Sequence, residues 1–92
     1  MPRVRVKYLN FYYTITRKKE EYIEFDESFT LGQLLNTLSE RYGSKFNRVI
    51  FNNDNKPKRD IWIMVNRGVT NDLEVELKDG TEVIFSLPLS GG

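Results

Sequence analysis

The chain has 92 residues, 39% of them hydrophobic and 13% aromatic, which is enough for one core and too few for two. Its 14 basic and 13 acidic residues nearly balance, which argues against a nucleic-acid binder, because such proteins carry a basic surface. The sequence contains no cysteine and no histidine, so disulfides, thiolate nucleophiles, histidine catalysis and zinc sites built on these ligands are excluded.

The sequence also lacks a recognisable membrane or secretion segment. The longest aliphatic and aromatic run, Ile61 to Val65, is too short to cross a bilayer. The N-terminus alternates basic residues with valines and offers no continuous apolar stretch of the kind that signal peptides contain. We therefore expect a cytoplasmic protein.

The N-terminal residues predict a β-hairpin. Val4, Val6 and Tyr8 alternate with basic residues, as in a strand with one buried face. After Tyr8 the apolar residues move to odd-numbered positions, which predicts a bulge or a short irregular segment. A polar turn at residues 17–20 then leads to a second strand over Tyr22–Phe25.

The strongest local pattern predicts a helix over Leu31–Tyr42. Thr30 and Gln33 have the residue types and the spacing of a capping box at its start. Gly43 fits the glycine that often ends a helix. The apolar residues recur on one helical face, at Leu31, Leu34, Leu35, Leu38 and Tyr42.

The second half of the chain predicts further strands and one long loop. Arg48–Phe51 has the composition of a short strand, whereas Asn52–Asp60 is rich in turn-forming residues and predicts an exposed loop. The apolar run Ile61–Val65 predicts a central strand that is covered on both faces. Leu73–Leu77 fits either a strand or an extended loop, and a turn precedes the last strand, Glu82–Leu87.

These elements predict an α+β fold in which a mixed sheet buries the stripe of one main helix. Pro88 cannot donate a hydrogen bond to a sheet, so strand pairing is expected to weaken there. The residues after it are expected to form a free tail.

Nearly the whole chain resembles the β-grasp fold of ubiquitin and, more closely, the small subunit of molybdopterin synthase and its sulfur-carrier relatives. The segments that carry this resemblance are Val4–Tyr8, Glu21–Phe25, Thr30–Leu35, Ser39–Gly43, Ile63–Asn66, Leu77–Val83 and Leu87–Gly92. One departure is at Asn66-Arg67-Gly68, where the glycine stands one residue later than in the usual Asn-Gly turn of that family. The resemblance implies a single ubiquitin-like domain over residues 1–92, with a flexible tail over residues 87–92.

The resemblance also implies a chemistry for the C-terminus. Gly92 would be adenylated by a ubiquitin-activating-type enzyme that uses ATP, and then converted to a thiocarboxylate. The sulfur would pass to a molybdopterin precursor on the large synthase subunit, or to another acceptor. The tail that enters these partners would be Leu87, Pro88, Leu89, Ser90 and Gly91. The chain would then be a protein cosubstrate and not an enzyme, with no bound cofactor or metal, no catalytic side chain, and no nucleic-acid or membrane partner.

Glycine suits such a terminus for physical reasons. Gly91 and Gly92 have no Cβ, so they can enter a narrow channel and adopt backbone angles that other residues avoid. The six residues from Leu87 onward can extend over roughly 20 Å, at about 3.3 Å per residue. A terminal glycine pair arises by chance in about one chain in two hundred, because glycine is near 7% of residues on average.

Other functions use the same features. Thiolation of tRNA and ubiquitin-like modification of lysines depend on the same tail chemistry. A β-grasp binding module could instead hold a partner through its sheet or through Phe11–Tyr13, and its tail would then be dispensable. The basic clusters at residues 17–19 and 56–59 fit either solvated turns or docking patches.

Overall fold

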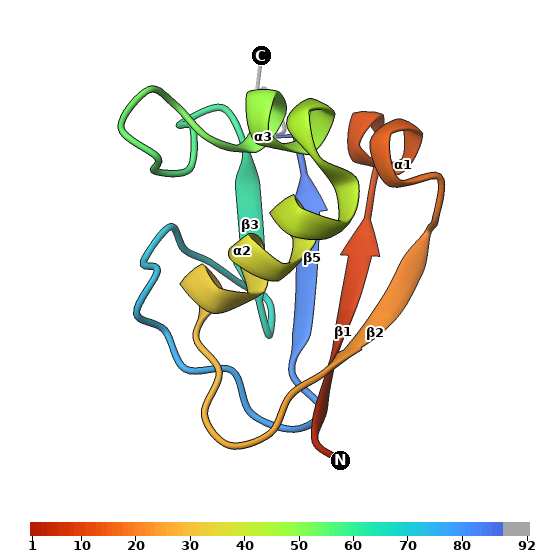
Figure 1. Ribbon diagram of the computed structural model, residues 1–92, viewed down its shortest axis with the longest axis vertical. Helices are drawn as coiled ribbons and strands as arrows, with labels where there is room; N and C mark the ends of the chain where they lie inside the picture. Colours follow the sequence, from red (N-terminus) through yellow and green to blue (C-terminus); the bar gives the residue numbers. More distant parts are fainter. Residues whose placement is uncertain (88–92) are drawn as a thin grey trace.

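The computed structural model describes residues 1–87 and contains a five-stranded mixed sheet with helices packed on one face (Figure 1). The strands are β1 (Arg3–Tyr8), β2 (Glu20–Glu24), β3 (Trp62–Val65), β4 (Gly68–Val69) and β5 (Glu82–Ser86). Their order across the sheet is β2-β1-β5-β3-β4, with β1 and β5 parallel and every other pair antiparallel. This arrangement is a β-grasp fold and confirms the predicted α+β class.

The main helix, α2 (Leu31–Tyr42), begins and ends as predicted. The Thr30 hydroxyl accepts a hydrogen bond from the Gln33 backbone N–H at 3.2 Å, and the Gln33 side chain accepts one from the Thr30 N–H at 2.8 Å. These two bonds form a capping box, which satisfies backbone donors that a helix start leaves free. Gly43 follows with a φ of 76°, which an L-residue rarely adopts, and the helix ends there.

One hydrophobic core joins α2 to the sheet. The helix contributes Leu31, Leu34, Leu35 and Leu38, none of them more than 1% exposed. The sheet contributes side chains from the three inner strands, namely Val4, Val6, Tyr8, Ile63, Val83 and Phe85. Because these side chains alternate along each strand, only the face toward the helices is buried in this core.

The segment after β1 is a short helix, α1 (Phe11–Thr16), and the predicted bulge or irregular segment was wrong. Tyr12 and Thr16 lie four residues apart and are both buried, whereas Phe11 and Tyr13 are exposed. That spacing is typical of a helix with one buried face. The apolar residues at odd-numbered positions had instead indicated an extended or irregular segment. The predicted hairpin pairing is confirmed, since β1 and β2 are antiparallel neighbours.

The predicted short strand at Arg48–Phe51 was also wrong, because residues Ser44–Ile50 form a third helix, α3. Phe46 and Ile50 are four residues apart, and their side chains are 2% and 0% exposed. Burial of this helical face decides the conformation, against the strand propensity of the β-branched residues near its end. The exposed loop predicted at residues 52–60 is present, with only Pro57 buried in it.

Strand β3 was predicted to be central and covered on both faces, and neither expectation holds. β5 occupies the centre of the sheet, and β3 lies between β5 and the short edge strand β4. Ile61 and Ile63 are buried, while Trp62 and Met64 on the opposite face are only half-buried. An unbroken apolar run therefore marked a strand whose second face is only partly covered.

The segment before β5 takes the extended-loop alternative, with Leu77 buried in the core and a single bridge between Glu76 and Thr30. The predicted turn follows, since the Thr81 N–H donates to the Lys78 carbonyl at 2.9 Å. Within residues 1–87, no helix is long and apolar enough to span a membrane, and no group of three potential ligands could hold a metal ion.

Candidate functional site

The structure describes the base of the predicted reactive tail. Leu87 is 40% exposed and directly follows the last strand. Pro88, Leu89, Ser90, Gly91 and Gly92 lie outside the described residues. Strand β5 therefore sets the position of Leu87, the last described residue before the predicted tail insertion residues 88–92.

Strand β5 is held firmly on both sides. Its Phe85 lies opposite Tyr8 of β1 and opposite Ile63 of β3. The rings of Phe85 and Tyr8 are stacked, with centroids 5.7 Å apart, and the Phe85 carbonyl accepts a hydrogen bond from the Leu9 N–H at 3.0 Å. Phe85 itself is fully buried. The tail thus starts from a fixed point at the end of the central strand.

The face of the sheet that the helices leave uncovered, called here the outer face, carries an apolar row next to this point. Ile84 of β5 lies opposite Lys7 of β1 and Met64 of β3, and Met64 lies opposite Val69 of β4. Val69 is 54% exposed, whereas Ile84 and Met64 are half-buried. Trp62, also half-buried, lies opposite Ser86 beside them.

Ion pairs border the apolar row on the β1 side. Glu82 of β5 lies 3.4 Å from the Lys7 ammonium and 3.8 Å from the Arg5 guanidinium. Arg5 also donates to Glu20 at 2.6 Å, and this pairing lowers the pKa of the Glu20 carboxyl. An apolar centre with a charged rim is typical of protein–protein docking surfaces.

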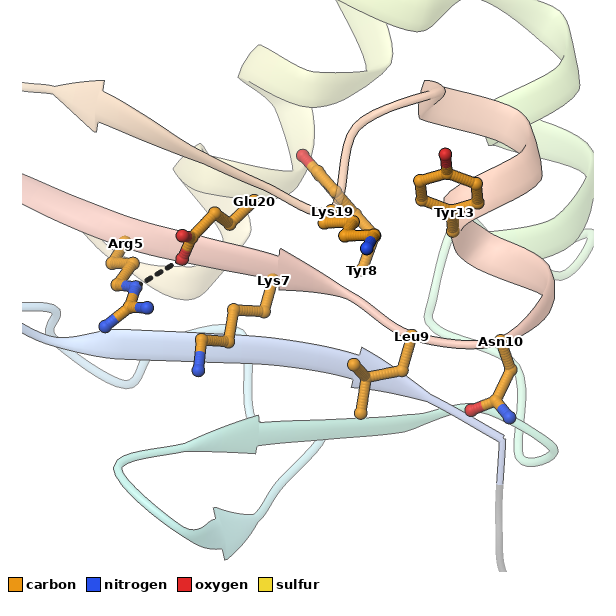
Figure 2. A pocket seen from close by; sticks show the side chains of 8 residues that line it. All are labelled: Arg5, Lys7, Tyr8, Leu9, Asn10, Tyr13, Lys19 and Glu20. Atoms are coloured by element: carbon orange, nitrogen blue, oxygen red, sulfur yellow. Dashed lines mark hydrogen bonds and ion pairs between the residues drawn. The ribbon is translucent and has the colours of Figure 1, made fainter.

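A shallow hollow of about 440 Å³ lies where β1 runs into α1 (Figure 2). Figure 2 shows the side chains of Lys7, on β1, and of Leu9, just after β1, extending on the same side toward β5, whereas Tyr13 on α1 points the other way. Leu9 and Tyr13 are 43% and 42% exposed, so both present apolar surface to solvent. Asn10, which joins the two elements, has a φ of 55°.

Sequence reasoning missed a buried carboxylate, Glu21, that ties three elements together. Its side chain is only 7% exposed. It accepts hydrogen bonds from the Tyr8 hydroxyl at 2.6 Å, from the Arg41 guanidinium at 2.7 Å and from the Tyr42 hydroxyl. Lys18 adds an ion pair at 3.5 Å. The signal was present in the sequence, because Glu21 shares the inward parity of Ile23 on β2.

These contacts shift the pKa values of the groups involved. Burial acts to raise the pKa of Glu21, but the hydrogen bonds from Tyr42, Tyr8 and Arg41 outweigh burial, and the net shift is downward. Burial and the hydrogen bond to Glu21 raise the pKa of Tyr42 to about 12, and the same causes raise the pKa of Tyr8. The carboxylate is therefore ionised and both phenols are protonated at neutral pH.

Comparison with known proteins shows where this architecture belongs. The ThiS family matches residues 6–92, which is nearly the whole chain and includes the terminal Gly91-Gly92. The chain belongs to the ThiS family. Among curated proteins, none matches it significantly.

Solved structures of similar shape include several ubiquitin-like carriers. The putative molybdopterin converting factor subunit 1 of Pyrococcus furiosus is 28% identical, with a TM-score of 0.78 over 97% of this chain and 100% of that one. The small archaeal modifier protein 1 of Methanosarcina acetivorans is 24% identical, with a TM-score of 0.79 over 100% and 98% of the two chains. A chain of the BexX/CysO complex of Amycolatopsis orientalis is also 24% identical, with a TM-score of 0.73 over 97% and 99%.

Membership of the ThiS family confirms the resemblance to the small subunit of molybdopterin synthase and its sulfur-carrier relatives. Proteins of this family are small ubiquitin-like carriers and not catalysts in their own right. The remaining sequence candidates are surface features in this ThiS-family chain. The basic residues 17–19 are exposed on a turn. In the second basic cluster, Lys56 and Arg59 are exposed and Lys58 is half-buried, whereas Pro57 between them is buried.

Proposed function

We propose that this ThiS-family chain is a sulfur carrier in the biosynthesis of molybdopterin. The observation that carries the proposal is the family match, which extends through the terminal Gly91-Gly92. The likeness to the Pyrococcus furiosus molybdopterin converting factor subunit 1 supports the specific pathway, because it covers 97% of this chain and the whole of that one at 28% identity.

The proposed chemistry takes place at the C-terminal carboxylate. An oxygen of Gly92 attacks the α-phosphorus of ATP on an adenylating partner, which expels pyrophosphate and leaves an acyl-adenylate. Hydrosulfide, or a donor of sulfur at the same oxidation level, then attacks the activated carbonyl carbon. The bond from that carbon to the phosphate oxygen breaks, and AMP leaves with this oxygen. The sulfur of the resulting thiocarboxylate bonds to a pterin precursor on the large synthase subunit. Water then cleaves the bond between the carbonyl carbon and the sulfur, which leaves the sulfur on the precursor and restores the carboxylate. ATP is bound by the partner, so the carrier needs no cofactor of its own.

The described residues support this proposal through the anchoring of β5. A reacting group at the end of a tail must be delivered to two different partners, so the domain has to present the tail from a fixed point. Phe85 supplies that point, since it is fully buried and lies between two paired strands. Leu87, the next residue after β5, is exposed.

The outer face supports docking of those partners. Ile84, Met64 and Val69 form an apolar row beside the end of β5, and the Glu82 ion pairs border it. A partner that covers this row holds the domain while the tail reaches into its active site. The proposed partners are the adenylating enzyme and the large synthase subunit, each using the same face in turn.

The fold likeness to small archaeal modifier protein 1 favours a second candidate, a modifier that becomes linked to lysines of other proteins. Both functions begin with the same adenylate, so the product distinguishes them. A carrier ends as a free thiocarboxylate, whereas a modifier ends in an amide bond to another chain.

Intact mass spectrometry of the protein from its native cell tests the proposal. We expect a species heavier than the 10.9 kDa chain by the difference between one sulfur and one oxygen atom. The added mass should disappear after alkylation and hydrolysis of the thiocarboxylate. A population made up of conjugates to other proteins, without any thiocarboxylate, would instead establish the modifier function.

A further inference from the structure

The helix side of the molecule carries a group of basic residues that the proposed carrier chemistry does not use. Residues 44–59, which comprise α3 and most of the loop after it, contain five basic residues and a single acidic one, Asp54. The rest of the chain then holds nine basic and 12 acidic residues. The near-zero net charge, which argued against nucleic-acid binding, therefore averages over two regions of opposite sign. We call the five residues the basic face: Lys45, Arg48, Lys56, Lys58 and Arg59.

The backbone holds the basic face in a defined shape. The Lys58 N–H donates to the Ile50 carbonyl and the Asn52 N–H donates to the Lys56 carbonyl, both at 2.8 Å. The Asn52 side chain accepts hydrogen bonds from the backbone N–H groups of Asp54 at 2.8 Å and Lys56 at 3.1 Å. The loop is thus folded back on the end of α3, which reduces the ordering cost of binding a ligand there.

Among the residues that the structure describes, none forms an ion pair with the basic face. Every ion pair within residues 1–87 involves a basic residue outside it, on β1, on the turn before β2 or on α2. Lys45, Arg48, Lys56 and Arg59 are exposed, and Lys58 is half-buried. Asp54 and Asp60 are the carboxylates nearest to the three loop cations in the sequence, and neither is ion-paired with any of the five. The region therefore keeps a net positive charge that attracts anions, and a flexible polyanion can contact several of the cations at once.

An amide-lined hollow of about 650 Å³ adjoins the basic face, between α2, α3 and the loop. Its wall includes Arg48 and the half-buried ring of Phe51. Amide side chains can pair with the edges of nucleobases, and an aromatic ring can stack on a base. An acidic polypeptide could bind the cations, but it has no nucleobases to pair with the amides or to stack on the Phe51 ring. The amides are those of Asn36, Asn47, Asn52, Asn53 and Asn55. The amide oxygens of Asn47 and Asn52 already accept hydrogen bonds, from the Ser39 hydroxyl and from the loop backbone, so these two offer a base only their NH2 groups.

We propose that the basic face and the amide-lined hollow together form a binding surface for a single-stranded nucleic acid. The cations contact phosphates, while the hollow accepts one or two unstacked bases. Figure 1 shows α3 and its loop at the end of the molecule toward which β5 points, on the helix side of the sheet. Trp62, just after the loop, lies opposite Ser86 at the end of β5. A nucleic acid held here leaves the outer face free for protein partners.

Fluorescence anisotropy with short labelled RNA and DNA single strands of the same mixed sequence tests this proposal. The full-length chain is compared with a triple variant, Lys56→Gln, Lys58→Gln and Arg59→Gln. The control variant, Arg17→Gln, Lys19→Gln and Lys78→Gln, makes the same change in net charge at exposed positions elsewhere. Each phosphate contact to a single strand contributes about 0.7 to the slope of log affinity against log salt.

We expect the unaltered chain to bind at low salt, and the basic-face variant to bind at least about tenfold more weakly with a slope smaller by about 2. The control variant should bind nearly as well as the unaltered chain. Three results would overturn the proposal: no binding at low salt, equal losses in both variants, or equally tight binding of poly-glutamate, which would indicate an acidic protein partner. The basic-face variant should support ATP–pyrophosphate exchange at the unaltered rate. A failure of nucleic-acid binding can therefore be distinguished from a failure of the proposed carrier function.

Discussion

At the scale of single residues, the carboxylate of Glu21 is the polar group whose loss we expect to matter most. It is nearly buried and accepts hydrogen bonds from Tyr8, Tyr42 and Arg41. Hydrogen bonds to charged groups contribute about 1.5–3 kcal/mol each when both partners are in place. We predict that Glu21→Gln lowers the free energy of unfolding at neutral pH by about 2 kcal/mol. Chemical denaturation measures this loss, with the exposed Glu20→Gln as a control that should lose less.

The same substitution makes a prediction about pH. Because the folded-state pKa of Glu21 lies below its unfolded value of about 4.3, its contribution is complete above that pH and disappears as the pH falls through the folded pKa. Unfolding curves of the unaltered chain and Glu21→Gln should therefore converge in acid. A constant difference in stability down to the lowest accessible pH would show that the ionised carboxylate is not the source.

The turn between β3 and β4 contains a residue in an unfavourable conformation. Asn66 and Arg67 have φ values of 48° and 76°, as in the two-residue hairpin turn for which Asn-Gly is preferred. A left-handed conformation costs an L-residue about 1–2 kcal/mol, part of which glycine recovers. We predict that Arg67→Gly raises the free energy of unfolding by about 0.5–1 kcal/mol. The control is Arg67→Lys, which keeps both the charge and an L-residue in the left-handed conformation. Equal free energies of unfolding for the two variants would contradict the argument.

At the scale of elements, α2 is the helix on which the core depends. Leu35 is 1% exposed and lies in the middle of its buried stripe. Truncation of such a side chain removes its burial and leaves a cavity, so we predict that Leu35→Ala costs about 2–5 kcal/mol. Urea denaturation measures the loss, with the exposed neighbour Asn36→Ala as a matched control. A cost below that of the control would mean that α2 is not packed on the sheet.

The outer face is the element-scale surface to which we assign partner docking. A charge placed in its apolar row would have to be desolvated in any complex. We predict that Met64→Glu weakens binding of the adenylating enzyme by at least about tenfold, which corresponds to about 1.4 kcal/mol. Thr37→Glu on α2 adds the same charge on the helix side and should bind normally. Surface plasmon resonance gives both affinities, and equal affinities would exclude the outer face from the interface.

The elements differ in how far the sequence alone could predict them. Helix α2 was predictable because its capping box, its apolar stripe and its terminal glycine are local signals that agree. Helix α3 was not, since its conformation depends on burial of Phe46 and Ile50 against elements distant in the sequence. The partly covered face of β3 depends on the sheet order, which no local pattern states.

The candidate site divides in the same way. The proposed reactive tail stays a prediction from the sequence, since Gly91-Gly92 can be read directly and the resemblance covers nearly the whole chain. For Glu21, the sequence indicates only that its side chain points to the same face of β2 as Ile23. Its hydrogen-bond and ion-pair partners come from three other segments, so the sequence could not predict them. The apolar row requires the pairing of three strands, so only the structure could assemble it.

At the scale of the whole molecule, packing belongs to the folded body and the proposed reaction to the terminal carboxylate. The central strand fixes where the tail begins, and the proposed chemistry takes place beyond it. Loss of a terminal glycine removes little buried surface, so stability should not depend on it. The position of the reacting carboxylate, by contrast, must be accurate, because a misplacement of about 1 Å can cost a hundredfold in rate.

Deletion of Gly92 therefore tests the central claim most directly, with ATP–pyrophosphate exchange by the cognate adenylating enzyme as the readout. A chain extended by one residue beyond Gly92 serves as the second variant, and a melting curve of each serves as the control for folding. We predict that both variants melt like the unaltered chain while the exchange reaction is abolished. Exchange at the unaltered rate by the chain that lacks Gly92 would contradict the account and leave a β-grasp binding module in its place.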